Sequence, residues 1–259
     1  MVNWKEKLKG DPIPWLLEPD EFQPAIRYYT LRDILGRDEN DKEVKAAKAA
    51  IMTSGPVPVI LAAQHPEGYW GKRPMYTGTM PSLVYMAQFG ADGADPRIRA
   101  GCEILLSRYI DSGGSLGGLS LKGSPSDFNY CAAGIMGAAL IDFGWLNDQR
   151  LQTAMEWLAQ AITGEGAANG SSLKSPPFAC SGRNAGLPCA WGAIKAMIAL
   201  NKVPPVQRTK NMHQAIKRGV DFLLSHDPAV ADYPFCRGTK PSSNWFKFYY
   251  PLRSEADVL

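Results

Sequence analysis

Hydrophobic positions recur along the chain at helical spacing and fall into units of roughly 54 residues, within the range of repeat architectures. In three of these units an apolar segment ends at a glycine, and an aspartate follows four or five residues later. Glycine adopts the left-handed conformation that ends many helices, and aspartate caps the next helix by accepting from its free N–H groups. Each unit is therefore predicted to be a hairpin of two helices. The residue pairs are Gly36 and Asp41, Gly90 and Asp95, and Gly144 and Asp148.

The two helices of each predicted hairpin differ in polarity. The second is amphipathic, as in residues 95–110. The first, as in residues 131–141 and 189–200, is apolar nearly all round and rich in small residues, which is typical of a helix buried on every side. We therefore expect buried inner helices to alternate with outer ones, and a fifth inner helix to begin near Trp245. The predicted inner and outer pairs are 24–35 and 41–62, 78–89 and 95–110, 129–143 and 148–163, and 188–200 and 208–226.

One motif adds a family resemblance. The run Gln64–Trp70 reads Gln-His-Pro-Glu-Gly-Tyr-Trp and matches the Q-x3-G-x-W core of the QW motif, in which the tryptophan stacks on the glutamine at a helix end. With its alternating helices, the chain resembles the α/α-toroid superfamily of squalene and terpenoid cyclases and protein prenyltransferases, and also its short squalene-cyclase-like members. Residues 24–33 and 189–196 carry the same likeness. The resemblance implies an all-α fold, an incomplete α/α toroid of about four to five helical hairpins. It would form a single domain over residues 1–259, with an N-terminal arm at 1–23.

The chain length bears on how such a ring would close. A toroid of six hairpins needs roughly 300 residues, and this chain has 259. We therefore expect an open ring, a homo-oligomer in which another copy closes the ring, or a chain truncated at its C-terminus. An open array of hairpins would also suit a non-catalytic interaction scaffold.

In the superfamily that the chain resembles, aromatic side chains at the inner-helix starts line a central apolar cavity. An isoprenoid or other apolar small molecule is therefore the ligand that the resemblance implies. The same side chains could instead fill the centre of a small barrel. The candidates are Tyr76, Tyr130, Trp191 and Trp245.

Catalytic carboxylates are harder to assign. The D-x-D-D motif of the cyclases and the D-D-x-x-D motif that binds diphosphate are both absent. Catalysis would then rest on isolated carboxylates, for which Asp127 and Asp142 are the candidates. For Asp142 a loop-facing position at a frayed helix end is the alternative.

The cysteines suggest a second kind of site. Cys131 and Cys189 each open a predicted inner helix in the string Cys-Ala-x-Gly. Cys180 lies nine residues before Cys189, and Cys236 precedes the predicted fifth inner helix. Because inner-helix starts gather at one end of a toroid, these four thiols could converge on a metal ion, with zinc as the first candidate and an iron–sulfur cluster as the second. Without paired C-x-x-C spacing, small buried hydrophobes and no cofactor are an equally open alternative. Cys102 falls on the apolar face of an outer helix and is predicted to be a core residue.

Charge and hydropathy exclude other classes of function. The chain has 28 Lys and Arg against 25 Asp and Glu, and a net charge of +3 spread so evenly does not favour a nucleic-acid partner. The longest apolar run, residues 57–63, contains a proline and is too short to span a membrane, and residues 1–10 lack the apolar segment of a signal peptide. We therefore expect a cytoplasmic protein whose cysteines are thiols or metal ligands rather than disulfides.

Overall fold

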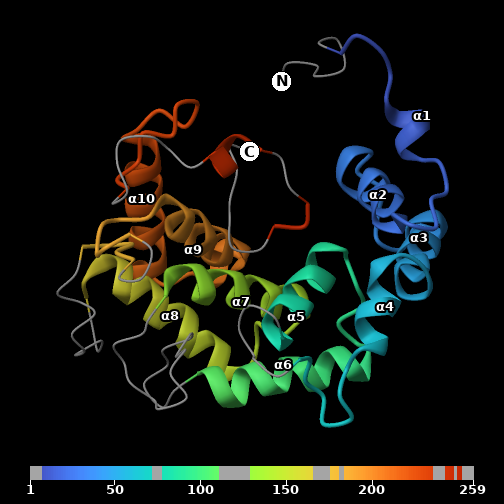
Figure 1. Cartoon of the computed structure of the whole chain (residues 1–259), viewed down its shortest axis with the longest axis horizontal. Helices are drawn as coiled ribbons and strands as arrows, with labels where there is room; N and C mark the ends of the chain where they lie inside the picture. The colour runs from blue at the N-terminus through green and yellow to red at the C-terminus, as the bar shows by residue number, and fades with distance from the viewer. Residues whose placement is uncertain are drawn as a thin grey trace. The chain divides into compact units, whose positions relative to one another are not determined.

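The computed structural model describes residues 8–71, 78–110, 129–165, 176–180, 184–235, 243–247 and 250–252. The chain divides into two compact units, one formed by Met1–Gln64 with Phe89–Asp92 and the other by His65–Gln88 with Gly93–Leu259. Within the described ranges there are ten α-helices and no strand, which confirms the predicted all-α class (Figure 1). Two compact units can belong to one domain, so the single domain expected over residues 1–259 stays a prediction.

The first unit contains the first predicted hairpin. Its inner helix is α2 (Pro24–Tyr29), which continues as one π-helical turn, η2 (Thr30–Ile34), and packs against α3 (Lys42–Thr53). Among the described residues of the predicted arm, the only helix is the short α1 (Ile13–Leu16).

The outer helix predicted over residues 41–62 is broken in two. Helix α3 ends at Thr53 and α4 (Pro56–Ala62) follows, because Gly55 has a φ of +70° and Pro56 can only begin a new helix. Among the described residues no single helix has the length and hydropathy of a membrane span, although α3 and α4, bent by 42° at this break, reach them together.

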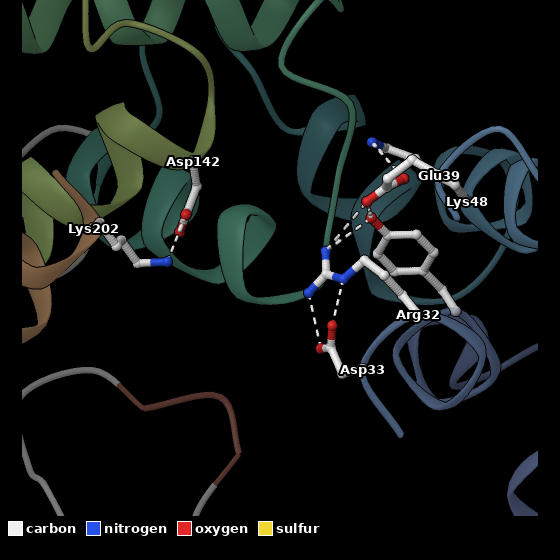
Figure 2. A network of polar contacts seen from close by, with 7 residues as sticks. Arg32, Asp33, Glu39, Lys48, Asp142 and Lys202 are labelled. Atoms are coloured by element: carbon white, nitrogen blue, oxygen red, sulfur yellow. Dashed lines mark hydrogen bonds and ion pairs between the residues drawn. The ribbon is translucent and has the colours of Figure 1, made fainter. Parts of the chain in front are cut away.

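A polar network holds the π-helical turn to the loop before α3 (Figure 2). The Tyr28 hydroxyl donates to Glu39 at 3.0 Å and accepts from the Arg32 guanidinium at 2.9 Å. Arg32 also donates to both carboxylate oxygens of Asp33, and its Cζ lies 4.9 Å from the ring centroids of Tyr28 and Tyr29. The side chains of Arg32 and Asp33 are 34% and 51% exposed, so their ion pair contributes at most about 1 kcal/mol. The network therefore links the turn to the loop before α3 and adds little stability.

The second unit contains three hairpins in two layers (Figure 1). Its helices are α5 (Thr79–Gln88), α6 (Pro96–Tyr109), α7 (Tyr130–Asp142), α8 (Gln149–Thr163), α9 (Ala190–Lys202) and α10 (Lys210–Leu224). Helix α7 packs between α5 and α9 in the inner layer, while α6, α8 and α10 each pack on the inner helix that precedes them. Nine of the 13 residues of α7 are buried, but only three of the 15 residues of α10. Outer helix α8 departs from this contrast, because nine of its 15 residues are buried. The predicted difference in burial therefore holds for α6 and α10, and the inner and outer layers of a toroid stay a prediction.

The junctions between paired helices have the predicted chemistry. Three aspartates cap the outer helices by accepting from backbone N–H groups two or three residues ahead, and three glycines end the inner segments with positive φ. The caps are Asp41, Asp95 and Asp148, and the glycines are Gly36, Gly90 and Gly144, with φ values of 63°, 76° and 82°.

The predicted QW-like motif forms a tight turn in the second unit over residues 65–70. The His65 N–H donates to the Tyr69 carbonyl at 2.7 Å, and the Gly68 N–H donates to the His65 carbonyl at 2.8 Å. The Trp70 side chain is 4% exposed and packs on α6, where a Cβ at Gly101 would lie 2.6 Å from the indole ring. The tryptophan thus ties this turn to an outer helix.

The fifth inner helix expected near Trp245 is a wrong prediction for the residues described there. Ser243–Phe246 form a single 3₁₀ turn, η6. The buried Trp245 donates from Nε1 to the Pro228 carbonyl at 3.0 Å, which fixes the turn against the loop after α10. Pro251 also limits any helix starting here, because proline and the residue before it disfavour helical continuation.

We expect Gly134→Ala to destabilise the fold by about 2–3 kcal/mol, because the added Cβ would lie 2.4 Å from the Lys195 carbonyl carbon and force α7 away from α9. The loss should appear although alanine favours a helix interior by roughly 1 kcal/mol over glycine. Gly192→Ala is the matched control, since its Cβ would meet no atom nearer than 3.3 Å, and it should change stability by less than about 1 kcal/mol. Urea unfolding measures both, and equal stability of the two variants would contradict the close helix contact.

We expect Asp148→Ala to lower the free energy of unfolding by about 1 kcal/mol at pH 7, because α8 loses its cap. Hydrogen bonds and charge from Arg150 hold the pKa of the Asp148 carboxyl below its ordinary value. A lowered folded-state pKa gives stability above the unfolded-state pKa of about 3.9, and this stability is lost as the pH falls. Thermal unfolding of wild type and variant should therefore differ less at pH about 3 than at pH 7. A difference that stays constant across this range would count against the cap.

Candidate functional site

Three of the four predicted thiols come together in the second unit. Side-chain hydrogen bonds join the Cys189 thiol to the thiols of Cys131 and Cys180. Cys189 is the N-cap residue of α9 and Cys131 is the second residue of α7, so two inner-helix starts meet at this point. All three side chains are half-buried and none forms a disulfide. We call Cys131, Cys180 and Cys189 the thiol cluster. The fourth predicted thiol, Cys236, lies outside the described residues.

The glycines of the two Cys-Ala-x-Gly strings explain why Cys131 and Cys189 meet. At Gly134 the backbone of α7 lies so close to the backbone of α9 that a Cβ would be 2.4 Å from the Lys195 carbonyl carbon. At Gly192 a Cβ would lie 3.8 Å from the Cys131 sulfur and 3.8 Å from the Cys189 Cβ. Each glycine therefore leaves the space that the other helix occupies.

A short antiparallel bridge brings Cys180 to the same place. Ala179 pairs with Pro188, the Cys180 N–H donates to the Leu187 carbonyl at 3.1 Å, and the Cys189 N–H donates to the Phe178 carbonyl at 2.9 Å. Side chains alternate between the two faces of extended backbone, so Cys180 and Cys189 project on one face as diagonal neighbours.

Asn184 anchors this loop. Its side chain is 4% exposed, and its Nδ2 lies 2.9 Å from the carbonyl oxygens of both Pro188 and Pro234 and 3.3 Å from that of Leu187. These bonds satisfy a buried amide and hold residues 184–188 against the segment at Pro234.

Backbone strain is concentrated around the thiol cluster. Among the described residues, three that are not glycine have positive φ: Phe178 at 63°, Ala185 at 50° and Ala231 at 52°. The Phe178 carbonyl accepts from Cys189, Ala185 lies in the same loop, and Ala231 shares a small core with Ala190. Each such conformation costs about 1–3 kcal/mol and persists where the surrounding structure enforces it, often at functional sites.

Electrostatics favour a protonated Cys189 when no cation is bound. The hydrogen bond to Cys131 raises the pKa of the Cys189 thiol, the hydrogen bond from Cys180 lowers it, and burial raises it, with a net shift upward. Cys102 behaves differently: it is fully buried in α6, and burial raises the pKa of its thiol to about 12. The prediction that Cys102 is a core residue is confirmed.

The thiol cluster has the kind of donor atoms that bind a metal ion, but these atoms are not arranged around one. Three thiols are donors that a soft cation such as zinc prefers. However, no group of three or more His, Cys, Asp or Glu side chains in the described ranges is already arranged to hold a metal ion. The thiol cluster thus fits a soft cation in kind but would have to shift, or gain a ligand, to enclose one.

The predicted aromatic candidates that the structure describes make contacts of a packed core. The Tyr130 hydroxyl donates to the Ala161 carbonyl at 3.0 Å and burial raises its pKa to about 12. Trp191 packs on the small core that contains the buried Trp245. Aromatic contacts continue from Tyr130 through Phe178, Phe222 and Tyr233 to Trp245, with ring centroids 5.1–6.0 Å apart. Binding of a substrate by these side chains stays a prediction, and Tyr76 lies outside the described residues.

Asp142, the candidate carboxylate that the structure describes, lies away from the thiol cluster. Asp142 is exposed at the last turn of α7 and pairs with Lys202 of α9 at 2.5 Å (Figure 2). It lies eleven positions after Cys131 along α7, a distance of about 16 Å along the helix axis. Asp142 thus occupies the helix-end position that we gave as its alternative, and Asp127 lies outside the described residues.

Sequence reasoning missed two residues that build the site. Asn184 opens the string Asn-Ala-Gly, and asparagine and glycine are both common in turns, so a turn could have been predicted there. Phe178 gave no signal, since an aromatic residue with positive φ is not expected from sequence.

Searches against family models, curated proteins and solved structures found no match for this chain. The resemblance to the α/α-toroid superfamily therefore stays a prediction.

We expect Tyr130→Phe to cost about 1–2 kcal/mol in stability, because a buried carbonyl of α8 loses its donor. Tyr233→Phe is a matched control: its hydroxyl donates to the Leu223 carbonyl at 2.8 Å, but the side chain is only half-buried and water can replace it. Denaturant unfolding should therefore show the larger loss for Tyr130→Phe. The reverse order would contradict a packing role for Tyr130.

Proposed function

We propose that the thiol cluster binds a soft metal ion, with zinc as the first candidate. The observation that supports this most directly is the convergence of the three cysteines: the space beside Gly192 borders the Cys131 sulfur and the Cys189 Cβ, and the bridge between Ala179 and Pro188 brings Cys180 to Cys189. In a tetrahedral site with zinc–sulfur bonds of about 2.3 Å, neighbouring sulfurs lie about 3.8 Å apart. Binding would therefore draw the three sulfurs to this spacing, since they are not already arranged around an ion.

Two electrostatic effects act on the thiols when they lose their protons to bind a metal ion. Several thiolates in contact repel one another, so their deprotonation requires a compensating positive charge. The N-terminal ends of α7 and α9 supply partial positive charge from unpaired N–H groups, which adds to the stabilisation of thiolates.

We expect the loop that carries Cys180 to make most of the movement that metal binding requires. Cys131 and Cys189 lie at the starts of two helices that pack tightly, whereas Cys180 is held by one bridge and two backbone hydrogen bonds. Cys236 is proposed as the fourth ligand, which would give a closed structural site. A water molecule in its place would give the open position found in catalytic zinc sites.

We also propose that the hairpins belong to an incomplete α/α toroid, on the strength of the alternating inner and outer helices of the second unit. Closure of the ring by a second copy is part of that proposal. Because thiolate ligands must stay reduced, the function further implies a reducing compartment such as the cytoplasm. The aromatic contacts described above do not favour an apolar ligand over core packing, so no substrate is proposed.

We expect the full chain, expressed without a metal-binding tag and purified anaerobically, to hold one zinc ion per chain. Cys131→Ser, Cys180→Ser and Cys189→Ser should each lose zinc, whereas Cys102→Ser, the matched control in a separate core, should retain it. Elemental analysis with a zinc-binding competition assay gives the measurement. Loss of zinc in Cys236→Ser supports the closed site, and retention supports the open one.

Circular dichroism identifies any variant that simply fails to fold. Wild-type protein that holds clearly less than one zinc ion, even after zinc is added in excess, would refute the proposal. Equal zinc content in Cys189→Ser and Cys102→Ser would refute it as well.

A further inference from the structure

We infer that Cys189 is the common partner of a reversible disulfide, formed with either Cys131 or Cys180, that switches metal binding at the thiol cluster off. This inference deepens the proposed function, because the same three thiols serve both. The formation of the disulfide itself does not require that the metal be zinc, or that a metal be present.

The central position of Cys189 comes from two independent structural contacts. From one side, Cys131 is placed against it by the glycine contact between α7 and α9, since the space beside Gly192 borders both the Cys131 sulfur and the Cys189 Cβ. From the other side, Cys180 is placed by the antiparallel bridge between Ala179 and Pro188. The Cys189 thiol makes hydrogen bonds to both neighbours, so it has two possible partners within reach.

The local backbone can follow the change in sulfur separation. A disulfide bond is about 2.05 Å long, shorter than any hydrogen-bonded contact between thiols, so the partner cysteines must approach. The left-handed residues Phe178 and Ala185 border the loop of Cys180 and Cys189, and relief of their conformations is a source of such movement. Half-burial gives a small disulfide access to the cluster.

The chemistry is thiol–disulfide exchange with a low-molecular-weight disulfide such as oxidised glutathione. One cluster thiolate attacks a sulfur of the oxidant, forms a mixed disulfide and releases one reduced glutathione. A second cluster thiol, after losing its proton, attacks the protein sulfur of that mixed disulfide, forms the protein disulfide and releases the second glutathione. The protein loses two electrons and two protons, and the oxidant gains both, so that two reduced glutathione molecules leave.

The consequence for metal binding follows from the number of thiols. A disulfide between Cys189 and either neighbour removes two of the three thiols of the cluster, so at least two of the four positions around a tetrahedral ion lose their thiolate ligands. Reduction restores all three. The oxidation state of the cluster would therefore determine whether the chain carries its metal.

The test uses the full chain, stripped of metal with a chelator and equilibrated with oxidised and reduced glutathione. We expect intact mass spectrometry to show the loss of two hydrogens, and alkylation under denaturing conditions to modify three of the five cysteines instead of all five. Peptide mapping should find Cys189 in the linked peptides. Zinc added to the oxidised protein should not bind, and a reductant should restore binding.

Single variants give a pattern that only a shared partner predicts. Cys131→Ser and Cys180→Ser should each still lose two hydrogens, because Cys189 keeps one neighbour, and Cys102→Ser should behave as wild type. Cys189→Ser should form no disulfide within the cluster. A disulfide joining Cys131 to Cys180 as the main product, or no disulfide in the wild type, would overturn the inference.

The outcomes also separate this inference from the proposed function. Disulfide formation in a chain that binds no zinc would refute the metal site and leave the redox chemistry intact. Zinc binding in a chain whose cluster forms no disulfide would support the metal site and refute the redox switch. Peptide mapping uses the wild-type protein, so the test stays decisive even if a substituted protein fails to fold.

Discussion

The direct approach of two helix backbones, α7 against α9 at Gly134, is the constraint on which the second unit depends. No side chain separates the helices there, since even a single Cβ would overlap the Lys195 carbonyl carbon. The inner layer can therefore be made of small residues and still be buried. The same contact places the starts of both helices together, and with them Cys131 and Cys189. Packing and candidate chemistry thus have one origin, the Cys-Ala-x-Gly string at the start of each helix.

The loop that carries Cys180 has the opposite character. It is held by one bridge, by the buried amide of Asn184 and by a Phe178 backbone in the left-handed region. Hydrogen bonds around Asn184 offset the conformational strain of the loop. The site therefore joins two thiols on a rigid frame with a third on a strained segment. Such an arrangement suits a cluster that changes between thiol, metal-bound and disulfide forms.

Local signals in the sequence predicted the helices well. Glycine and aspartate act through their own backbone and side chain, so the hairpin junctions at Asp95 and Asp148 could be recognised without tertiary information. The equivalence of Cys131 and Cys189 followed from the repeat.

Other features were not predicted. The glycine and proline at residues 55 and 56 are a local signal for a helix break, although a continuous helix was predicted there. The turn at Trp245 depends on a contact with Pro228 that no local pattern encodes. The position of Cys180 depends on a bridge and a left-handed phenylalanine, which are settled only by the folded loop. For Tyr130 the sequence left packing and ligand binding open, and its hydrogen bond to Ala161 shows the packing contact.

The central claim is that three cysteines share one site, and binding of trivalent arsenic tests it most directly. Arsenite joins three converging thiols in one complex and releases three water molecules. We predict one arsenic per chain, a mass gain of one arsenic less three hydrogens, and protection of Cys131, Cys180 and Cys189 from alkylation in the folded protein. Arsenic that does not bind, or alkylation that proceeds equally at the three thiols with and without it, would contradict the account.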